Sequence, residues 1–359
     1  MGFFGFGKKS KLGIDIGTAS IKIVELTKDA NRHKLLNYGI FELESADDAI
    51  NLAGQSGRSK IAQLSNADVA SSIKEILKKA HITSKDVVAS IPSFPTFSTT
   101  ITMPYLSEED IAKAIPFEAR KYIPVPLNEV QLDWAIVQTP KKVAKDAPAG
   151  NVEVFLVAVP KVEVARYQGI MKDAGLNLRA LELENFALIR ALVGNDLSPI
   201  AIVNIGGRST SIIIVENGFQ RLSHDYEIGG FEITKSIARA LGLNLKRAEE
   251  LKRNFGIRNS SENIVRQSMS SLIDLMVFET NKTIHNFEDQ KHTKVTRIFL
   301  VGGLVNMLDF VPYFSEKLGR PVTPGNSFAR VVMPPNLENL RPELNATFVV
   351  SAGLAMRDL

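Results

Sequence analysis

Two segments far apart in the chain contain residues suited to binding phosphate. The first runs from Leu12 to Lys22 and includes Asp15-Ile16-Gly17-Thr18-Ala19-Ser20. The second runs from Ile202 to Ile212 and includes Asn204-Ile205-Gly206-Gly207-Arg208-Ser209-Thr210. In each, a β-branched run ends at Asp or Asn, passes through glycine and small hydroxyl residues, and enters another β-branched run. Glycine lets backbone N–H groups converge on an anion, and a nearby carboxylate can hold a hydrated divalent cation. Two copies predict a clamp on one nucleotide.

Each candidate residue has a plainer alternative. Asp15 ends an apolar strand, where burying a carboxylate is costly without a cation, but aspartate also caps its own turns. Lys22 lies on the outgoing strand, where it can reach a phosphate or be an ordinary surface lysine. In the second segment, Gly206, Gly207, Ser209 and Thr210 are candidates for phosphate binding, and Arg208 adds charge or faces solvent.

Three further groups of residues have a similar double interpretation. Gly229-Gly230 opens a helix whose free N–H groups suit an anion, or it makes a tight strand-to-helix turn. Glu249 and Lys252 are three residues apart and therefore share a helix face. They either bind a ligand together or form a surface ion pair. Gly302-Gly303 follows a strand and permits close backbone approach, although a glycine pair there is also an ordinary turn.

The elements around these residues predict a repeated architecture. Residues 11–43 predict a three-stranded meander with turns near 29–32 and 37–39, followed by an amphipathic helix over 67–80. After Leu197, strands over 200–205, 211–216 and 219–226 repeat the meander, with an Asn217-Gly218 turn between the last two. Helices over 231–241, 245–255 and 261–287 follow, and then a strand over 297–301.

Residues 84–160 differ in character and predict a small α+β insert. Its strands are expected at 87–92, 99–104, 131–138 and 152–160, with a mobile hairpin tip over 140–150. Ser107 and Asp110 resemble a capping box at a helix start. Pro116 is expected to break that helix, so that Phe117–Tyr122 forms a new helical segment.

Composition limits the class of protein. At 359 residues the chain exceeds one ordinary hydrophobic core, so two domains are expected, with a division near 180–200. The absence of cysteine excludes disulfides, thiolate zinc sites and cysteine nucleophiles, and fits a reducing cytoplasm. The five histidines lack metal-ligand spacing.

Charge and hydropathy exclude two further classes. The net charge of +4 comes from small scattered groups of lysines, so nucleic-acid binding is not indicated. The longest apolar runs are too short to cross a bilayer. The first eleven residues include three phenylalanines and three lysines. They are suited to touching an anionic membrane surface, or the phenylalanines pack against the first strand.

The motifs together resemble a known superfamily. The two turns, the Gly302-Gly303 loop and the C-terminal helix Ala352–Ala355 are similar to actin, sugar kinases and heat-shock chaperone ATPases. Within that superfamily, Gly13–Leu26, the phrase Phe117–Pro124 followed by Asp133-Trp134, and Ile228–Thr234 resemble the PilM family of type IV pilus assembly proteins. The resemblance covers essentially the whole chain.

The resemblance implies an α/β fold with two actin-like lobes, duplicated ribonuclease-H-like domains similar to those of the division protein FtsA. The first lobe is expected at 1–190, with the insert at about 84–160, and the second at 191–359. ATP is expected between the lobes. The expected partners are the cytoplasmic tail of PilN, a single-span pilus protein, and other pilus components including the assembly ATPase. This places the protein in the cytoplasm, peripheral to the inner membrane.

The resemblance also implies roles for the candidate residues. Asp15 holds a hydrated magnesium ion, and Gly17, Thr18 and Ala19 direct N–H groups to the β- and γ-phosphates. Glu249 contacts the ribose and Lys252 the adenine, while Gly302 and Gly303 approach the purine with help from Asn306. Either Glu182 or Glu184 positions water. Asn204 stands where many members of the superfamily have aspartate, which predicts slow or absent hydrolysis.

Two other functions stay open from the sequence. An FtsA-like division adaptor usually ends in a membrane-binding amphipathic helix, whereas this sequence stops at Leu359 directly after the last core helix. A small-molecule kinase needs a carboxylate base, and no Asp-Gly-type base motif occurs between the halves.

Overall fold

The computed structural model describes residues 10–29, 32–42, 64–93, 96–104, 106–138, 150–257 and 263–358. The chain divides into two compact units, one formed by Met1–Ile91 and Ile170–Leu359 and the other by Pro92–Gly169. The aromatic and basic N-terminal residues up to Lys9, and the predicted hairpin tip apart from Gly150, lie outside the described residues.

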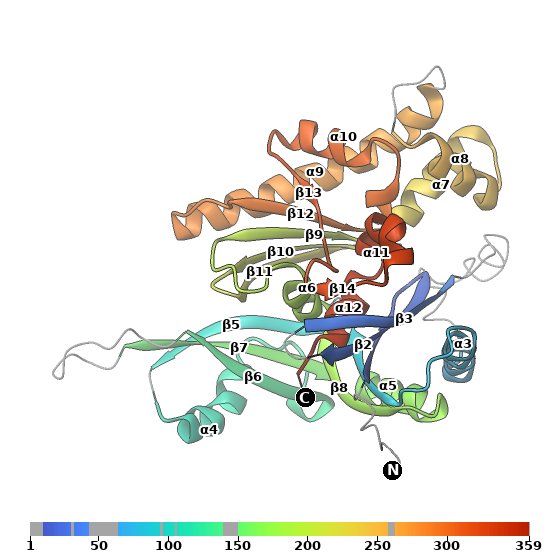
Figure 1. Ribbon diagram of the computed structural model, residues 1–359. Coiled ribbons are helices and arrows are strands. Elements are labelled where there is room, and N and C mark those ends of the chain that lie inside the picture. The colour runs from blue at the N-terminus through green and yellow to red at the C-terminus, as the bar shows by residue number, and fades with distance from the viewer. Residues whose placement is uncertain are drawn as a thin grey trace, which may run out of the picture. The chain divides into compact units, whose positions relative to one another are not determined.

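The larger unit contains a six-stranded sheet in the order β14-β3-β2-β1-β4-β8 (Figure 1). Strands β1, β2 and β3 form an antiparallel meander, and β4 and β8 extend the sheet in parallel. The strands are β1 Ser10–Ile16, β2 Ser20–Asp29, β3 Arg32–Glu42, β4 Asp86–Ile91, β8 Asn177–Leu183 and β14 Val331–Val332.

The same unit contains a second sheet in the order β11-β10-β9-β12-β13. Its strands are β9 Ile200–Ile205, β10 Thr210–Glu216, β11 Phe219–Tyr226, β12 Arg297–Gly302 and β13 Thr323–Pro324. Here too an antiparallel meander is extended by a strand parallel to its first member. The two sheets therefore repeat one topology, which confirms the predicted repeat.

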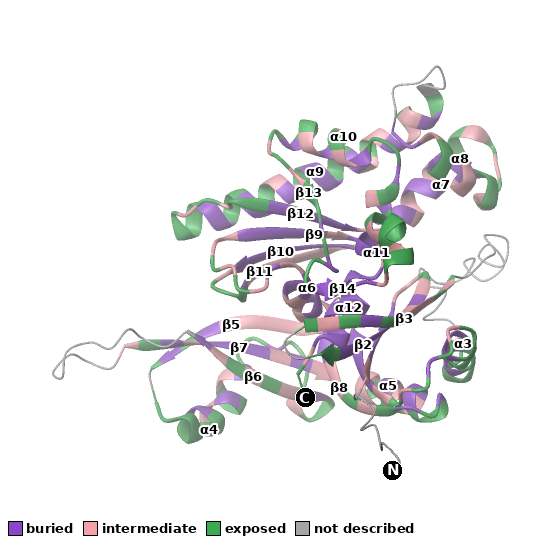
Figure 2. Cartoon of the chain, viewed as in Figure 1, coloured by how far each residue is buried: buried purple, intermediate pink, exposed green. Residues whose placement is uncertain are grey.

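Burial on both faces explains the continuous apolar runs of the central strands (Figure 2). One face of the second sheet contributes Val203, Ile205 and Ile212 to a core shared with Ile237, Met269 and Phe314. The other face contributes Ile202 and Ile213 to a core with Leu188 and Leu354.

The helices of this unit are α3 Asn66–Lys79, α6 Glu184–Leu192, α7 Gly230–Leu241, α8 Leu245–Phe255, α9 Asn263–Lys291, α10 Phe310–Leu318, α11 Arg341–Thr347 and α12 Val349–Ala355, with 3-10 turns η2 Gly303–Asn306 and η3 Pro335–Leu340.

The C-terminal segment returns to the first sheet. Strand β14 pairs with His33 and Lys34 of β3. Phe348 and Ala352 share a hydrophobic core with Val24 of β2. Helix α12 contributes to both cores, since Leu354 packs with the second sheet and Ala352 with the first. The expected division of the lobes at residue 191 stays a prediction.

The turn predicted near residues 37–39 does not occur. Strand β3 continues through it, and the pairing with β2 shifts between Glu25 and Leu26. Gly39 has a packing role instead, since a Cβ atom there would collide with the side chain of Ile76 on α3. Glycine in this strand marks close approach of a helix and was mistaken for a turn.

The smaller unit has a three-stranded antiparallel sheet in the order β5-β7-β6, from Phe97–Pro104, Asn151–Pro160 and Val130–Gln138. Helix α4, Glu108–Ala119, packs Ile111, Ile115 and Ala119 into its core. The 3-10 turn η1 spans Leu127–Glu129, and α5, Lys161–Asp173, begins within this unit. The predicted insert also included strand 87–92, but β4 belongs to the six-stranded sheet between β1 and β8.

Pro116 lies inside α4 and does not end it, so the expected break and the new segment over Phe117–Tyr122 are wrong. The N-cap prediction is confirmed, because Ser107 accepts a hydrogen bond from the Asp110 amide at 3.2 Å. Buried residues at positions 111, 115 and 119 hold one helix face in the core, while Pro116 is exposed. Packing of this face therefore offsets the hydrogen bond that proline cannot make.

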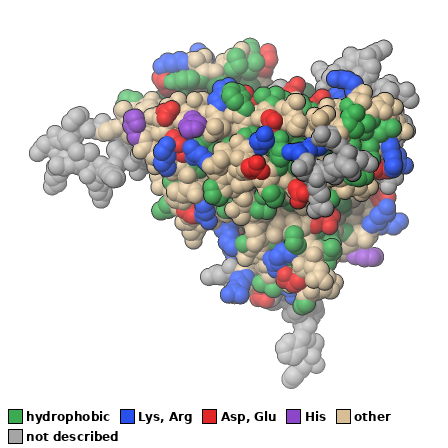
Figure 3. All heavy atoms as spheres, turned by 90° about the horizontal axis from the view of Figure 1, so that it is seen from above, with side chains coloured by type: hydrophobic (Ala, Val, Ile, Leu, Met, Phe, Trp, Pro, Cys, Tyr) green, Lys and Arg blue, Asp and Glu red, His purple; other side chains and the backbone are tan. Residues whose placement is uncertain are grey.

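The surface carries mixed charge. In the view of Figure 3, the Lys and Arg side chains of the described residues lie among Asp and Glu and do not gather into a stripe. Within the part of the chain that the structure describes, no helix has both the length and the apolar character needed to span a membrane.

Candidate nucleotide-binding site

The two glycine turns close in the same way. The Gly17 N–H donates to the carbonyl of Ser20 at 3.0 Å, and the Gly206 N–H donates to the carbonyl of Ser209 at 2.9 Å. Each turn joins the first strand of a meander to the second. Because these two amides close the turns, Gly17 and Gly206 shape them, and phosphate binding would fall to the residues between glycine and serine.

The structure brings the two turns together. A Cβ atom built on Gly207 would lie 3.0 Å from Cβ of Ala19 and 3.3 Å from Oγ1 of Thr18. Both turns belong to the same compact unit. Residues about 190 positions apart in the chain thus face each other, as a clamp on one nucleotide requires.

Asp15 is buried at the end of β1 and has partners on both neighbouring strands. Ser90 of β4 donates its hydroxyl to Oδ1 at 3.0 Å, and Nζ of Lys22 on β2 lies 4.0 Å from Oδ2. Asp15 and Lys22 are also paired in the register of the sheet. Lys22 therefore points toward Asp15 and is not an isolated surface lysine. Ser90 was missed by sequence reasoning, since a lone serine in an apolar strand carries no pattern.

The residues around Asp15 fit a hydrated magnesium ion. The described residues include no group of three or more His, Asp or Glu side chains that could enclose a metal directly. Mg²⁺ commonly keeps several waters and is held by one or two carboxylates together with substrate phosphates. A single buried carboxylate next to a phosphate-type turn suits that mode.

The start of α7 is tied to the second turn. The N–H groups of Gly230 and Phe231 donate to the carbonyls of Gly206 and Gly207 at 3.0 and 2.7 Å. A Cβ atom on Gly229 would lie 2.6 Å from the Gly206 oxygen, so only glycine fits there. These amides are committed to the turn. The Gly230 amide is therefore engaged in a tight strand-to-helix turn, and anion binding by Gly229 and Gly230 stays a prediction.

Thr210 also has a structural task. Its side chain is fully buried, and its hydroxyl donates to the carbonyl of Ile228 at 2.7 Å. This hydroxyl is therefore engaged within the fold, and phosphate binding by Thr210 stays a prediction. Arg208 stacks its guanidinium over the Phe231 ring, with 5.0 Å to the ring centroid.

Glu249 and Lys252 form part of a compact polar cluster. Nζ of Lys252 lies 2.6 Å from Oε2 of Glu249, 2.9 Å from Oγ1 of Thr234 and 3.0 Å from the carbonyl of Gly230. The Lys252 side chain is 9% exposed and that of Glu249 is 33% exposed. The alternative of a purely surface ion pair is therefore wrong, because the ammonium is buried and has three acceptors.

Burial and pairing shift both pKa values. Burial lowers the pKa of Lys252, and the negative charge of Glu249 opposes part of that effect. Burial alone would raise the pKa of Glu249. The Lys252 ammonium and hydrogen bonds from Lys252, Thr234 and Arg253 outweigh burial and lower it. Glu249 is therefore held as a carboxylate that can accept hydrogen bonds.

The glycine pair after β12 serves two purposes. Gly302 has φ +98°, and a Cβ atom there would collide with the backbone of Ile205, so it lets the ends of β12 and β9 meet. Gly303 is exposed with open space beside its Cα, and Asn306 is exposed at the end of η2. Between them, Leu304 approaches Gly230, which also lies beside Lys252. The structure thus joins three of the predicted segments around α7.

Glu182 does not suit a role in positioning water. Arg190 binds both its carboxylate oxygens at 2.6 and 3.0 Å, and Arg357 adds a third contact at 2.7 Å. The carboxylate is buried and fully engaged. Of the two glutamates proposed for hydrolysis, Glu184, the first residue of α6, is left as the candidate.

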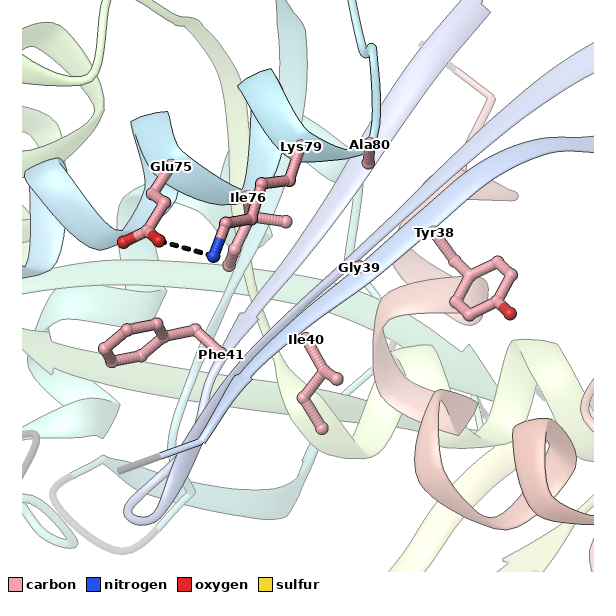
Figure 4. Close-up of a pocket in the computed structure, with 8 residues that line it drawn as sticks. All are labelled: Tyr38, Gly39, Ile40, Phe41, Glu75, Ile76, Lys79 and Ala80. Atoms are coloured by element: carbon pink, nitrogen blue, oxygen red, sulfur yellow. Dashed lines mark ion pairs between the residues drawn. The ribbon is translucent and has the colours of Figure 1, made fainter. Parts of the chain in front are cut away.

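A pocket of about 200 Å³ lies between β3 and α3 (Figure 4). It is lined by Tyr38, Gly39, Ile40, Phe41, Glu75, Ile76, Lys79 and Ala80, and Glu75 pairs with Lys79 at 2.7 Å. None of these is a predicted site residue, and the volume is below that usual for ligand pockets.

Comparison with protein families shows which family the chain belongs to. A family model described as type IV pilus assembly protein PilM matches residues 13–359. The chain belongs to the PilM family. The predicted resemblance is confirmed, and the match spans both meanders, both turns and the smaller unit.

Solved structures agree on the fold. The PilM–PilN type IV pilus biogenesis complex contains a chain 23% identical, with a TM-score of 0.80, covering 97% of this chain and 98% of that one. EutJ, the ethanolamine utilization protein of Carboxydothermus hydrogenoformans, is 16% identical with a TM-score of 0.55, covering 97% and 89%. MreB5 of Spiroplasma citri, bound to AMPPNP, is 12% identical with a TM-score of 0.51, covering 96% and 94%. This PilM-family chain therefore has the actin-like ATPase fold that the sequence predicted.

Proposed function

We propose that this chain is an ATP-binding scaffold of the type IV pilus assembly machinery. The facing turns Gly17–Ser20 and Gly206–Ser209 are the observation that carries nucleotide binding. Asp15 would hold hydrated Mg²⁺ beside the phosphates, and Glu249 with Lys252 would contact the ribose and the base. A related fold binds AMPPNP in MreB5, which supports the proposal.

The proposed partner is the cytoplasmic segment of a PilN-like single-span membrane protein. A chain of the same family and fold occurs in a PilM–PilN complex, and this supports the proposal. Such a partner would keep the protein at the cytoplasmic face of the inner membrane. Nucleotide would bias partner binding by stabilising whichever arrangement of the protein it prefers.

Equilibrium binding of ATP in the presence of magnesium tests the first part. Asp15→Asn should weaken Mg-ATP binding by at least about tenfold, since it removes the charge facing the metal. Asp86→Asn is the matched control, because Asp86 lies in the same sheet at the start of β4 and pairs with Arg179 at 2.8 Å. Equal affinity of both variants, or no binding of ATP by the wild type, would refute nucleotide binding at this site.

The partner is tested with the cytoplasmic peptide of the PilN-like protein encoded in the same genome. Titration with and without Mg-ATP should give two different affinities, and Asp15→Asn should abolish the difference. Absence of peptide binding under both conditions, with a folded protein, would contradict the scaffold role.

A further inference from the structure

Thr234 stands at the centre of the cluster around Glu249 and Lys252, although no sequence motif singled it out. Thr234 is 2% exposed. Oγ1 accepts a hydrogen bond from Nζ of Lys252 at 2.9 Å and lies 2.5 Å from Oε2 of Glu249 and 3.0 Å from the carbonyl of Gly230. One hydroxyl thus contacts both members of the pair and the first residue of α7.

The hydroxyl has a single proton to donate. Its two possible acceptors are the Gly230 carbonyl and the Glu249 carboxylate. The shorter distance goes to the carboxylate, and charged acceptors form the stronger hydrogen bonds. The Gly230 carbonyl is still satisfied by Lys252. Thr234 therefore directs its proton to Oε2 of Glu249.

These contacts leave Glu249 with one oxygen that is only partly engaged. Among the described residues, Oε2 receives Thr234 and Lys252, whereas Oε1 receives Arg253 alone at 3.0 Å. A carboxylate oxygen has two lone pairs. The remaining acceptor capacity of this carboxylate thus lies mainly on Oε1, on a side chain that is one-third exposed.

The cluster is also connected to the second phosphate-type turn. Gly230, whose carbonyl binds Lys252, donates its own N–H to the carbonyl of Gly206. A change at Thr234 would therefore act on helix α8 and on the first turn of α7 together.

We propose that Thr234 is a positioning residue that fixes the rotamer of Glu249, so that Oε1 accepts a ribose hydroxyl, and that holds the Lys252 ammonium in place. This inference rests on the proposed nucleotide binding. Thr234 thereby sets the preference of the site for a ribonucleotide over one that lacks both hydroxyls.

The chain offers a closely matched control. Thr280 on α9 is fully buried, and its hydroxyl donates to the carbonyl of Met276 four residues earlier at 2.8 Å. The Thr234 hydroxyl likewise lies 3.0 Å from the carbonyl four residues earlier, that of Gly230, although its proton goes to Glu249. Thr280→Val therefore reproduces the loss of a buried hydroxyl in a helix without touching Glu249 or Lys252. Thr234→Ser keeps the hydroxyl and serves as the conservative rescue.

The first measurement is the ratio of affinities for ATP and 2′,3′-dideoxy-ATP, with magnesium, in wild type, Thr234→Val, Thr234→Ser, Thr280→Val and Glu249→Gln. A hydrogen bond to a charged group predicts a wild-type preference for ATP of about tenfold or more. We expect Thr234→Val to lose most of this preference, as Glu249→Gln does. Thr234→Ser and Thr280→Val should retain it. If Thr234→Val prefers ATP over 2′,3′-dideoxy-ATP as strongly as the wild type does, the proposal is overturned.

The second measurement needs no nucleotide. Acylation of Lys252 by an amine-reactive ester, followed by mass spectrometry, should be several-fold faster in Thr234→Val than in wild type, Thr234→Ser or Thr280→Val. Equal rates in all four proteins would overturn the positioning of Lys252. If the wild type binds no ATP but Lys252 is acylated faster in Thr234→Val, then the proposed nucleotide binding is refuted. The proposed ribose preference is refuted with it. The effect of Thr234 on Lys252 would then stand alone.

Discussion

Ser90 donates its hydroxyl to Oδ1 of Asp15 across two adjacent parallel strands, and both side chains are buried. On the other side, Lys22 approaches Oδ2 at 4.0 Å. The carboxylate proposed to face magnesium is therefore oriented from one strand and neutralised from another. This arrangement explains how a charged group is tolerated at the end of a buried strand.

Removing the Ser90 hydroxyl should weaken the response of the site to magnesium. Groups that orient a metal-associated carboxylate typically contribute 10- to 100-fold to metal affinity. We expect Ser90→Ala to raise the magnesium concentration for half-maximal ATP binding by about tenfold, measured by titrating Mg²⁺ at fixed ATP. Ser72→Ala is the control, since Ser72 is buried and its hydroxyl donates to the carbonyl of Asp68 in its own helix, away from Asp15. Identical magnesium curves for the two variants would show that Ser90 does not orient Asp15.

The contact between the two turns predicts a second effect. Gly207→Ala would place a methyl group 3.0 Å from Cβ of Ala19, which is too close for two carbon atoms. The turns must then move apart, so ATP binding should weaken by about tenfold while the unfolding midpoint changes little. Gly169→Ala provides the comparison, because a Cβ atom there meets nothing within 4 Å. Unchanged ATP affinity in Gly207→Ala would argue against a clamp formed by these turns.

The turns and the repeated meanders were predictable because glycine and β-branched patterns are local. The contacts of Thr210 with Ile228, of Gly230 with Gly206 and of Lys252 with Thr234 were not, since each partner lies on another element or turn and only tertiary contacts define it. Pro116 and Gly39 show the converse. Local rules predicted a break and a turn, but burial of Ile115 and packing of Ile76 against Gly39 prevail. The return of β14 to β3 carries no local signal in a two-residue strand.

Stability should depend on pH through Glu288, a buried carboxylate on α9. Hydrogen bonds from Arg320 at 2.7 and 3.1 Å, followed by one from Lys294 at 2.8 Å, outweigh burial and lower its pKa to about 2. A lowered pKa means that the stabilisation is fully present above the ordinary value of 4.5 and is lost as the pH falls toward 2. It amounts to roughly 3 kcal/mol.

Urea unfolding at pH 7, 4.5 and 2.5 measures this contribution. Glu288→Gln should be less stable than wild type at pH 7, and the difference should shrink toward pH 2.5. Glu338→Gln is the control, because that carboxylate also binds an arginine, Arg341, at 2.7 Å but lies on the surface. Its stability should stay near that of the wild type. A difference for Glu288→Gln that is independent of pH would rule out this carboxylate as the source.

Asn204 predicts slow hydrolysis of the bound nucleotide. It lies near the end of the central strand β9 as Asp15 lies near the end of β1, but its amide is neutral, so it cannot act as a base and offers a metal no negative charge. Asn204→Asp supplies the missing carboxylate and should raise the rate of phosphate release from saturating Mg-ATP by at least about tenfold.

Asn217→Asp is the control. It makes the same substitution in the exposed turn between β10 and β11, where φ of +55° is tolerated by aspartate, and should leave the rate unchanged. If Asn204→Asp binds Mg-ATP normally but releases phosphate no faster, the amide is not what limits hydrolysis. Glu184 at the start of α6 would then be the next residue to test.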